Sequence, residues 1–482
     1  MLHRRTFLLS SLVAPFIRPL QARAQENVDV VVIGAGLSGL NAAWILDQAG
    51  LNVRVLEGAS RPGGRAMTAY DSEGDPELGA SQIGPSYARV RDAIDQLGLE
   101  LIPEHRPLMP FANYMDGRLI DQDEWADAPE NKTAGDERAI PPVMMHDALL
   151  QKFNPLQELD DWLDPKFADY DVSLFDVFAK NNVSHAAMRL AKLTTGGMDL
   201  SIVSALTLFQ EKTRGVFERD YYKNTVLAAH GDNPNPSPPT HNIKGGTSKL
   251  PEAMAQALSH EVSYNRIVTR IDMDASGADV YTHDGAKTRA TFVISALPFT
   301  MLRRIHISPG LPTLHRDAVN TMPYLYTTRA NVSIKEPYWE EDGLSPSLIT
   351  DTISRMFWAI DKRPEDSTYK GQFVLMGQSA AAIDALPQEH VPQMLLDDLA
   401  RIRPATKGKI EIQHYHSWAN APLIAGCRHS FAPGQVKRFA RDMITPVDRL
   451  HFAGEHTRRL EYGMEAAMES GERAALEILE RI

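Results

Sequence analysis

A glycine turn followed by an acidic residue is the most specific chemical signal in the chain. Residues 34–39 read GAGLSG and lie between the apolar run 28–33 and a helical pattern that extends to Ala49. A second apolar run, 51–56, ends at Glu57. In a βαβ unit, such a turn lets the backbone approach a pyrophosphate at a helix N-terminus, and the carboxylate accepts hydrogen bonds from a ribose diol. The segment therefore predicts a dinucleotide site at the edge of a parallel sheet.

A second glycine turn narrows the class of nucleotide. Gly63-Gly64-Arg65 follows Glu57 closely, and nicotinamide-dependent dehydrogenases do not require such a turn. Flavoproteins of the amine oxidase type do require it, and their arginine faces the phosphates of the flavin nucleotide. The next segment, 77–85 (ELGASQIGP), is rich in small residues that let the backbone come close to a flavin ring. Together these segments favour a flavin nucleotide.

The chain resembles the flavin-containing monoamine oxidase family, most strongly at residues 28–100, 242–312 and 448–478. The C-terminal segments carry the best match, with 452–456 (FAGEH) ending a predicted strand and 463–467 (GMEAA) opening a predicted helix. In the family this helix N-terminus points at the pyrimidine side of the flavin, and a backbone N–H at the position of Met464 bonds the ring oxygen. The positive end of the helix stabilises the anionic reduced flavin.

The resemblance implies an α/β fold, with a discontinuous Rossmann-type FAD-binding domain and an α+β substrate-binding domain, as in amine oxidases. The FAD-binding domain is predicted at residues 25–105, 240–312 and 440–482, and the substrate-binding domain at 106–239 and 313–439. Three further elements match the family: the glycine turn Lys244–Leu250, a strand led by His260-Glu261-Val262 that meets the adenine end, and a strand returning toward the flavin at Ile294–Pro298.

FAD is the cofactor that the resemblance implies. Some family members attach FAD through a cysteinyl thioether, and the only cysteine of the chain, Cys427, stands at that position. We expect non-covalent binding, with the thioether as the alternative. The cofactor-binding positions carried over from the family motifs are Gly34, Ala35, Gly36, Gly39, Glu57, Gly64, Arg65, Gly79, Ala80, Ser81, Gln82, Val262, Cys427, Gly454, Glu455 and Met464.

The positions expected to face the substrate depart from the family pattern. Gly463 and Arg428 stand where two tyrosines usually frame the flavin, and the neighbouring Tyr462 is a candidate replacement. Arg329 stands where the family has a lysine that holds a water against flavin N5, and Trp418 stands where a tryptophan lies close to the ring. An arginine at the flavin face welcomes a carboxylate through a bidentate contact. These four residues, Arg329, Trp418, Arg428 and Tyr462, are the predicted catalytic positions.

The resemblance predicts an FAD-dependent amine oxidoreductase. A hydride passes from the carbon next to the amine nitrogen to flavin N5, and the resulting imine hydrolyses to a carbonyl product. The arginines leave an L-amino-acid oxidase open as an alternative, and the altered aromatic frame leaves a non-catalytic FAD-binding electron carrier open. A flavin desaturase shares the N-terminal motifs but matches the C-terminal ones less well. More than 200 residues outside the FAD segments favour a closed substrate pocket, and therefore an enzyme.

Composition and the N-terminus limit the partners and the compartment. The 482 residues carry a formal net charge of -12, so nucleic acid and anionic membranes are poor partners. Residues 1–24 contain Arg4-Arg5, a short apolar run and Ala22-Arg23-Ala24, which predicts a twin-arginine export signal and a periplasmic protein without a stable membrane anchor. We expect a small amine substrate, O2 or another electron acceptor, and no metal site; the oligomeric state is left open, with a homodimer as the candidate.

Overall fold

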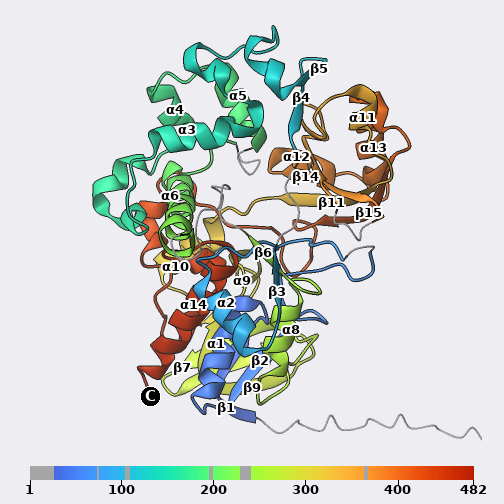
Figure 1. Ribbon diagram of the computed structural model, residues 1–482. Helices are drawn as coiled ribbons and strands as arrows, with labels where there is room; N and C mark the ends of the chain where they lie inside the picture. Colours follow the sequence, from blue (N-terminus) through green and yellow to red (C-terminus); the bar gives the residue numbers. More distant parts are fainter. Residues whose placement is uncertain (1–25, 73–74, 104–108, 195–198, 228–239, 363–366) are drawn as a thin grey trace, which may run out of the picture.

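The computed structural model describes residues 26–72, 75–103, 109–194, 199–227, 240–362 and 367–482 (Figure 1). The predicted export signal lies outside the described residues. In the described part, no helix is both long and apolar enough to cross a membrane.

The apolar run after the predicted export signal forms β1 of a seven-stranded sheet, between the edge strand β2 and β9. Its valines, Val30, Val31 and Val32, are completely buried, because the strand is covered on both faces. Strand β1 pairs in parallel with β2 on one side and with β9 on the other, and β16 pairs in parallel with β9. The carboxyl ends of these four strands therefore meet at one edge of the sheet. Their bounds are β1 (Glu26–Ile33), β2 (Val53–Leu56), β9 (Lys287–Ser295) and β16 (Leu450–Phe452).

The remaining strands of this sheet depart from the prediction at one place. No strand forms at Val262; only Ser263 makes an isolated bridge, to Leu56, and the next strand begins at Val268. The chain bends away because Asn265 adopts a left-handed φ of 56° and its N–H bonds the Ala59 carbonyl. The outer strands are β7 (Val268–Asp274), β8 (Gly277–Thr282) and β10 (His306–Ser308), in the order β10-β7-β8-β9-β1-β2.

Helices α1 (Leu37–Gln48) and α14 (Gly463–Leu479) pack against each other on this sheet (Figure 1). Gly39 lets α1 approach the turn that precedes it, since a Cβ at Gly39 would lie 2.0 Å from the Gly34 carbonyl oxygen. Gly471 permits the close approach of α14 to α1, because a Cβ there would lie 2.3 Å from the Ser38 carbonyl oxygen. Backbone thus meets backbone where the two helices cross. The neighbouring helices are α2 (Ala88–Gln96), α8 (Lys249–Gln256), α9 (Phe299–Leu302) and α10 (Thr313–Thr321).

A second seven-stranded sheet combines two segments that are distant in sequence, 111–121 and 327–417. Helices α12 (Gln378–Asp384) and α13 (Val391–Ile402) share a buried apolar core with it, and α11 (Trp339–Asp342) lies nearby (Figure 1). Its strands, in spatial order, are β15 (Ile410–Ser417), β11 (Thr327–Ile334), β14 (Tyr369–Met376), β13 (Met356–Ile360), β12 (Ser347–Thr350), β4 (Phe111–Met115) and β5 (Arg118–Asp121).

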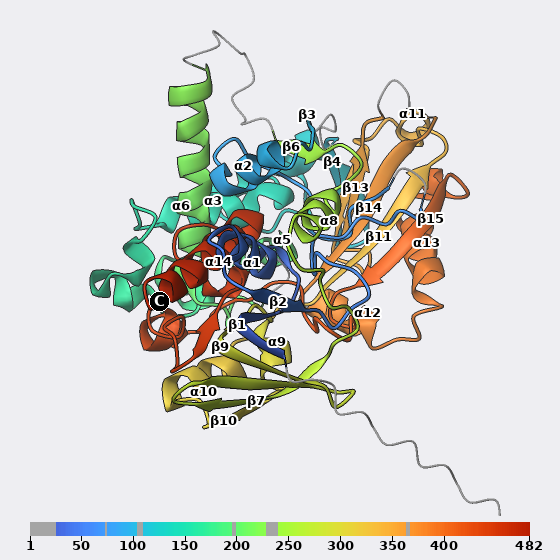
Figure 2. The same cartoon turned by 90° about the horizontal axis from the view of Figure 1, so that it is seen from below.

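A helical region completes the structure. Figure 2 shows its longest helix, α6 (Ala205–Tyr221), on one side of α1 and α14, with the second sheet on the other side. Both the helical region and the second sheet therefore flank the helices that cover the first sheet. The other elements are α3 (Met145–Phe153), α4 (Leu174–Lys180), α5 (His185–Thr194), and the two-stranded sheet of β3 (Leu101–Pro103) and β6 (His241–Ile243).

The helix contact predicts opposite effects for two helical glycines. Gly471→Ala places a methyl group against the Ser38 carbonyl, so we expect a loss of about 1–3 kcal/mol in the free energy of unfolding. The matched control is Gly215→Ala in α6, where a Cβ meets nothing within 4 Å. There we expect a gain of up to about 1 kcal/mol from helix propensity. Urea unfolding measures both; equal stability of the two variants would contradict the packing argument.

Candidate active site

The first glycine turn presents the start of α1 as an anion site. Gly34 has a φ of 102°, and its N–H bonds the Leu56 carbonyl at 2.8 Å, which aligns the turn with the end of β2. Gly36 is the N-cap of α1 and has no side chain to satisfy the first-turn N–H groups. A Cβ at Gly36 would meet nothing within 4 Å, so open space lies in front of these groups. Free helix N–H groups facing open space suit a phosphate.

Glu57 lies at the same edge of the sheet. Its two carboxylate oxygens accept the backbone N–H groups of Ala35 and Ala59, each at 2.7 Å. A carboxylate has about four acceptor sites, so the group retains capacity for ribose hydroxyls. Val262 is buried beside Glu57. The next residue, Ser263, fixes it there, because its N–H donates to the Val55 carbonyl and its carbonyl accepts the N–H of Glu57.

The second glycine turn folds back onto the first. The Gly63 N–H bonds the Ala35 carbonyl at 2.7 Å, and Gly63 and Gly64 both have a positive φ, 99° and 55°. This turn directs Arg65 toward the C-terminal segments, where its guanidinium donates to the Cys427 carbonyl and lies 3.8 Å from a Glu455 carboxylate oxygen. The structure therefore joins three predicted cofactor positions from three separate segments.

The small-residue segment after this turn meets the second sheet. Position 79 has room only for glycine, because a Cβ there would lie 1.9 Å from the Arg65 carbonyl oxygen and 2.9 Å from the Trp418 ring. Trp418 is buried and donates its indole N–H to the Leu78 carbonyl at 2.9 Å, while Arg329 donates to the Gly79 carbonyl at 3.1 Å. Gly79, Arg329 and Trp418 thus lie together. Ala80 and Ser81 are partly buried, whereas Gln82 is exposed.

Cys427 borders the same group. It is partly exposed, and Trp418 and the Cys427 side chain belong to one small apolar cluster. Its neighbour Gly426 cannot carry a side chain, because a Cβ would lie 2.7 Å from the Cβ of Tyr324. The loop is therefore fixed where the Cys427 carbonyl accepts its bond from Arg65.

The start of α14 forms the opposite wall. Its first intrahelical hydrogen bond runs from the Ala466 N–H to the Tyr462 carbonyl, at 3.4 Å, so the N–H groups of Gly463, Met464 and Glu465 precede it. Gly463 is exposed, with a φ of 63°, whereas the Met464 side chain is buried. The wall therefore offers backbone donors at an accessible position.

Tyr462 packs against Tyr87, which was not predicted from the sequence as a site residue. Its ring packs edge-to-face on Tyr87 with the centroids 6.3 Å apart, and the Arg214 guanidinium lies 5.8 Å from the Tyr462 centroid. A Cβ at Gly463 would be 3.5 Å from the Tyr87 hydroxyl. Tyr87 thus supplies an aromatic group next to Gly463, the position where the resemblance predicts a tyrosine.

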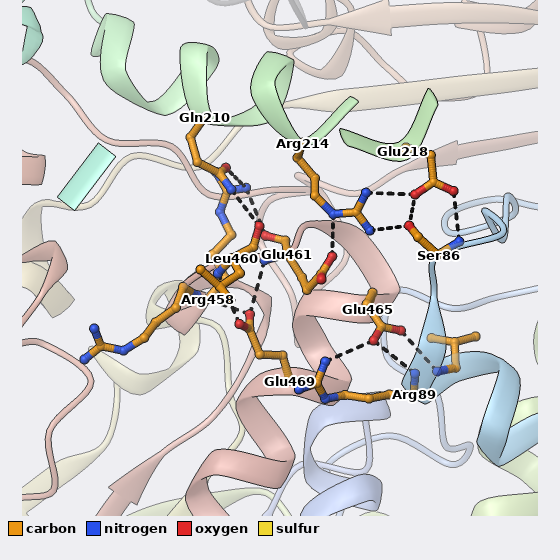
Figure 3. A network of polar contacts seen from close by, with 12 residues as sticks. Ser86, Arg89, Gln210, Arg214, Glu218, Arg458, Leu460, Glu461, Glu465 and Glu469 are labelled. Carbon is orange, nitrogen blue, oxygen red and sulfur yellow. Dashed lines mark hydrogen bonds and ion pairs between the residues drawn. The ribbon is translucent and has the colours of Figure 1, made fainter. Parts of the chain in front are cut away.

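A polar network clamps the segment that leads into α14 (Figure 3). From α6, Gln210 donates to the Leu460 carbonyl at 2.8 Å and Arg214 donates to the Glu461 carboxylate at 2.6 Å. From α14 itself, Glu469 accepts the N–H groups of residues 459–461. The clamp fixes the direction in which the helix begins.

Arg428 forms an ion pair with Glu211 of α6. Glu211 also lies 3.1 Å from Arg458, which is fully buried. Burial alone would raise the pKa of Glu211, but Arg428 and Arg458 outweigh it and hold that pKa below its usual value. Glu211 in turn raises the pKa of Arg428. Neither Glu211 nor Arg458 was predicted from the sequence, because nothing in the local pattern shows that distant residues form a pair.

Glu455 continues this chain of charges. It accepts a hydrogen bond from His429 Nδ1 at 2.9 Å, next to Arg65. Burial would raise its pKa, but His429 and Arg65 outweigh that effect and keep the pKa well below its usual value. The ring of His456 packs 4.3 Å from Phe299, and burial lowers the His456 pKa well below its usual value. Glu455 is therefore ionised and His456 is neutral at pH 7.

The arrangement fits FAD. Gly36, Arg65, Arg428 and Gly463 are all accessible, although they belong to otherwise well-packed segments, and we call this surface the accessible face. Phosphates suit the α1 N-terminus and Arg65, the ribose suits Glu57, and the ring suits the N–H groups of α14. Bound FAD supplies the hydride acceptor for oxidation of an amine. In the described part of the chain, no group of three histidine, cysteine, aspartate or glutamate residues could hold a metal ion.

His416 predicts a pH dependence of stability. It lies on β15 opposite Arg329, with its ring 4.4 Å from Trp418, and burial, His414, Arg61 and Arg329 lower its pKa to about 4. In the unfolded chain this histidine has a pKa of about 6.5, whereas in the folded chain it binds a proton only near pH 4. The free energy of unfolding is therefore highest above pH 6.5 and falls as the pH drops toward 4. Relative to wild type, His416→Phe should gain about 1–3 kcal/mol between pH 7 and pH 4, measured by urea unfolding. A difference that is independent of pH would contradict this assignment.

Comparisons with known proteins agree with this geometry. Residues 37–479 match the family model described as flavin containing amine oxidoreductase. Amine oxidase [flavin-containing] B from Homo sapiens is 28% identical over 94% of this chain and 86% of its own length. The probable flavin-containing monoamine oxidase A from Dictyostelium discoideum is 25% identical over 94% of this chain and 98% of its own length.

Two solved structures share the fold. Wild-type putrescine oxidase bound to putrescine has a TM-score of 0.75 and 23% identity, over 95% of this chain and 100% of that one. Cyclohexylamine oxidase from Brevibacterium oxydans IH-35A has a TM-score of 0.74 and 22% identity, over 94% and 99%. The match to the family model spans nearly the whole sequence, and the chain belongs to the flavin-containing amine oxidoreductases, as an FAD-dependent enzyme that acts on amines.

Proposed function

We propose that this enzyme oxidises a small amine without a carboxylate, using O2 as the electron acceptor and FAD bound without a covalent link. The observation that carries the proposal is the set of contacts at the accessible face: Arg65 donates to the carbonyl of Cys427, the neighbour of Arg428. Glu211 joins Arg428 to Arg458, which donates to the Glu461 carbonyl just before α14. Relatives named as oxidases support O2 as the acceptor. The product is an imine, which water hydrolyses to a carbonyl compound.

Several side chains have tasks that follow from their contacts. Trp418 and Gly79 form a wall of fixed shape, since the indole N–H is bonded to the backbone and the ring touches the glycine. Arg329 Nη1 bonds the Gly79 carbonyl, while its buried Nε has no partner among the described residues. We assign Arg329 the role of anchoring a water at this wall, because arginine can donate hydrogen bonds there but cannot act as a base.

The rival substrate is an amino acid held by an arginine. Arg428 and Arg329 are the candidates, but Arg428 already pairs with Glu211, and Arg329 already donates to a backbone carbonyl. The structure therefore favours the amine. For the other alternative, a non-catalytic FAD-binding electron carrier, no contact among the described residues gives comparable support.

We also propose export to the periplasm as a folded protein. The support is the paired arginine, apolar run and small-residue cleavage pattern of residues 1–24, and export in the folded state suits a protein that must first acquire a cofactor. Replacing Arg4 and Arg5 by lysine should keep the protein out of the periplasmic fraction; a periplasmic variant would contradict the assignment.

The central test is anaerobic reduction of the flavin absorbance by paired compounds. Each pair contains a primary amine and the amino acid that yields it on decarboxylation, for example 2-phenylethylamine with phenylalanine and putrescine with ornithine. We expect members of the amine set to bleach the flavin at least tenfold faster than their partners, and hydrogen peroxide to appear when air is admitted. Bleaching by amino acids alone would overturn the proposal. Precipitation with acid should release the FAD; flavin retained on the protein would establish a covalent link, and its loss in Cys427→Ala would assign that link to Cys427.

A further inference from the structure

Arg428 is held at the accessible face with its charge already matched. Its side chain is 39% exposed, although protein surrounds it and Glu211, its ion-pair partner, is only 19% exposed. Its backbone is fixed, since the Arg428 carbonyl accepts the Leu325 N–H at 2.7 Å. The guanidinium therefore borders open space while one side of it is committed to α6.

Three arginines and two carboxylates surround this position. Glu211 pairs with both Arg428 and Arg458, whereas Glu455 lies 3.8 Å from Arg65. The nearby histidines add no charge at pH 7. Burial lowers the pKa of His146, near Glu211, to about 4, and it also lowers the pKa values of His429 and His456. Without the negative charge of Glu211, Arg428 and Arg458 would lose the carboxylate that they share, and the positive charge of the accessible face would rise.

We propose that Glu211 determines substrate specificity: by pairing with Arg428 and Arg458, it prevents Arg428 from binding a substrate carboxylate and so excludes amino acids. This inference rests on the proposed function and refines it. A substrate carboxylate at Arg428 would either displace Glu211, leaving it with Arg458 alone, or share the guanidinium with it, and both arrangements place two carboxylates close together. Like charges at short range are strongly unfavourable where solvent is limited. Specificity here arises from cancelling an attraction to the wrong substrate.

The variant Glu211→Gln tests this directly. It keeps the size of the side chain and removes the charge, so Arg428 becomes free for an anion. We expect the ratio of kcat/KM for the amino acid to kcat/KM for its paired amine to rise at least tenfold, as for a gained charge-assisted hydrogen bond. We expect benzoate, followed by the perturbation of the flavin spectrum, to bind at least tenfold more tightly. The benzoate measurement needs no turnover.

Two further variants separate the charge effect from a structural effect. Asp147→Asn in α3 changes the net charge by the same amount. This carboxylate is 54% exposed and pairs with Lys212, the neighbour of Glu211 on α6, so the change should alter neither quantity. Adding Arg428→Met to Glu211→Gln should abolish both gains, because the proposal routes them through that guanidinium. Unchanged benzoate affinity in folded, FAD-loaded Glu211→Gln would overturn the proposal.

The single variant Arg428→Met keeps the idea testable if Glu211→Gln does not fold. We expect it to change the amino acid to amine ratio less than threefold, since the guanidinium is already engaged. A fall of a hundredfold or more would show that Arg428 anchors a carboxylate and would overturn the proposal. If no amine and no amino acid reduces the wild-type flavin, the proposed function fails, while the benzoate measurements still decide the role of Glu211.

Discussion

The close contact between α1 and α14 is the constraint on which the site depends. Gly471 allows backbone to touch backbone there, because it lies against the Ser38 carbonyl at the start of α1. Gly471 lies eight residues into α14 from Gly463, so the start of α14 lies about 12 Å farther along its axis. One contact therefore positions two helix N-termini at a set separation, one suited to phosphates and the other to the flavin ring. The clamp from α6 then fixes the segment before α14 (Figure 3).

Helix α6, which holds the segment before α14, also carries the residues that pair with the charged groups of the site. Gln210, Glu211 and Arg214 are neighbours on α6, and they respectively hold Leu460, the two arginines Arg428 and Arg458, and Glu461. Removing one member would leave a buried partner unpaired, which costs far more than the pair contributes. The substrate side of the enzyme is thereby tied to the cofactor side, although α6 belongs to neither sheet.

The sequence predicted the parts of the site that are continuous in the chain. The turn at 34–39, Glu57, and the helix that begins at Gly463 are where spacing placed them, because short-range geometry and glycine freedom determine such motifs. The strand at Val262 was wrong, because Asn265 takes a left-handed conformation and a long-range bond to Ala59 redirects the backbone.

Contacts between distant segments were beyond the sequence pattern. Arg428 was predicted as a cation near the flavin, yet its ion-pair partner Glu211 carries no motif of its own. Likewise, Tyr87 approaches Tyr462 only because α2 packs against α14. Spacing indicates which residues a local element presents, but the partner of each charge is decided by tertiary packing.

Binding of FAD to the apoprotein of Gly36→Val tests the central claim most directly. The φ of Gly36 is -74°, and a Cβ there meets nothing within 4 Å, so the variant should fold with unchanged thermal stability. If the open space before α1 holds the pyrophosphate, the valine side chain occupies that space, and the affinity for FAD should fall at least a hundredfold. An unchanged affinity in the folded variant would contradict this location of the cofactor.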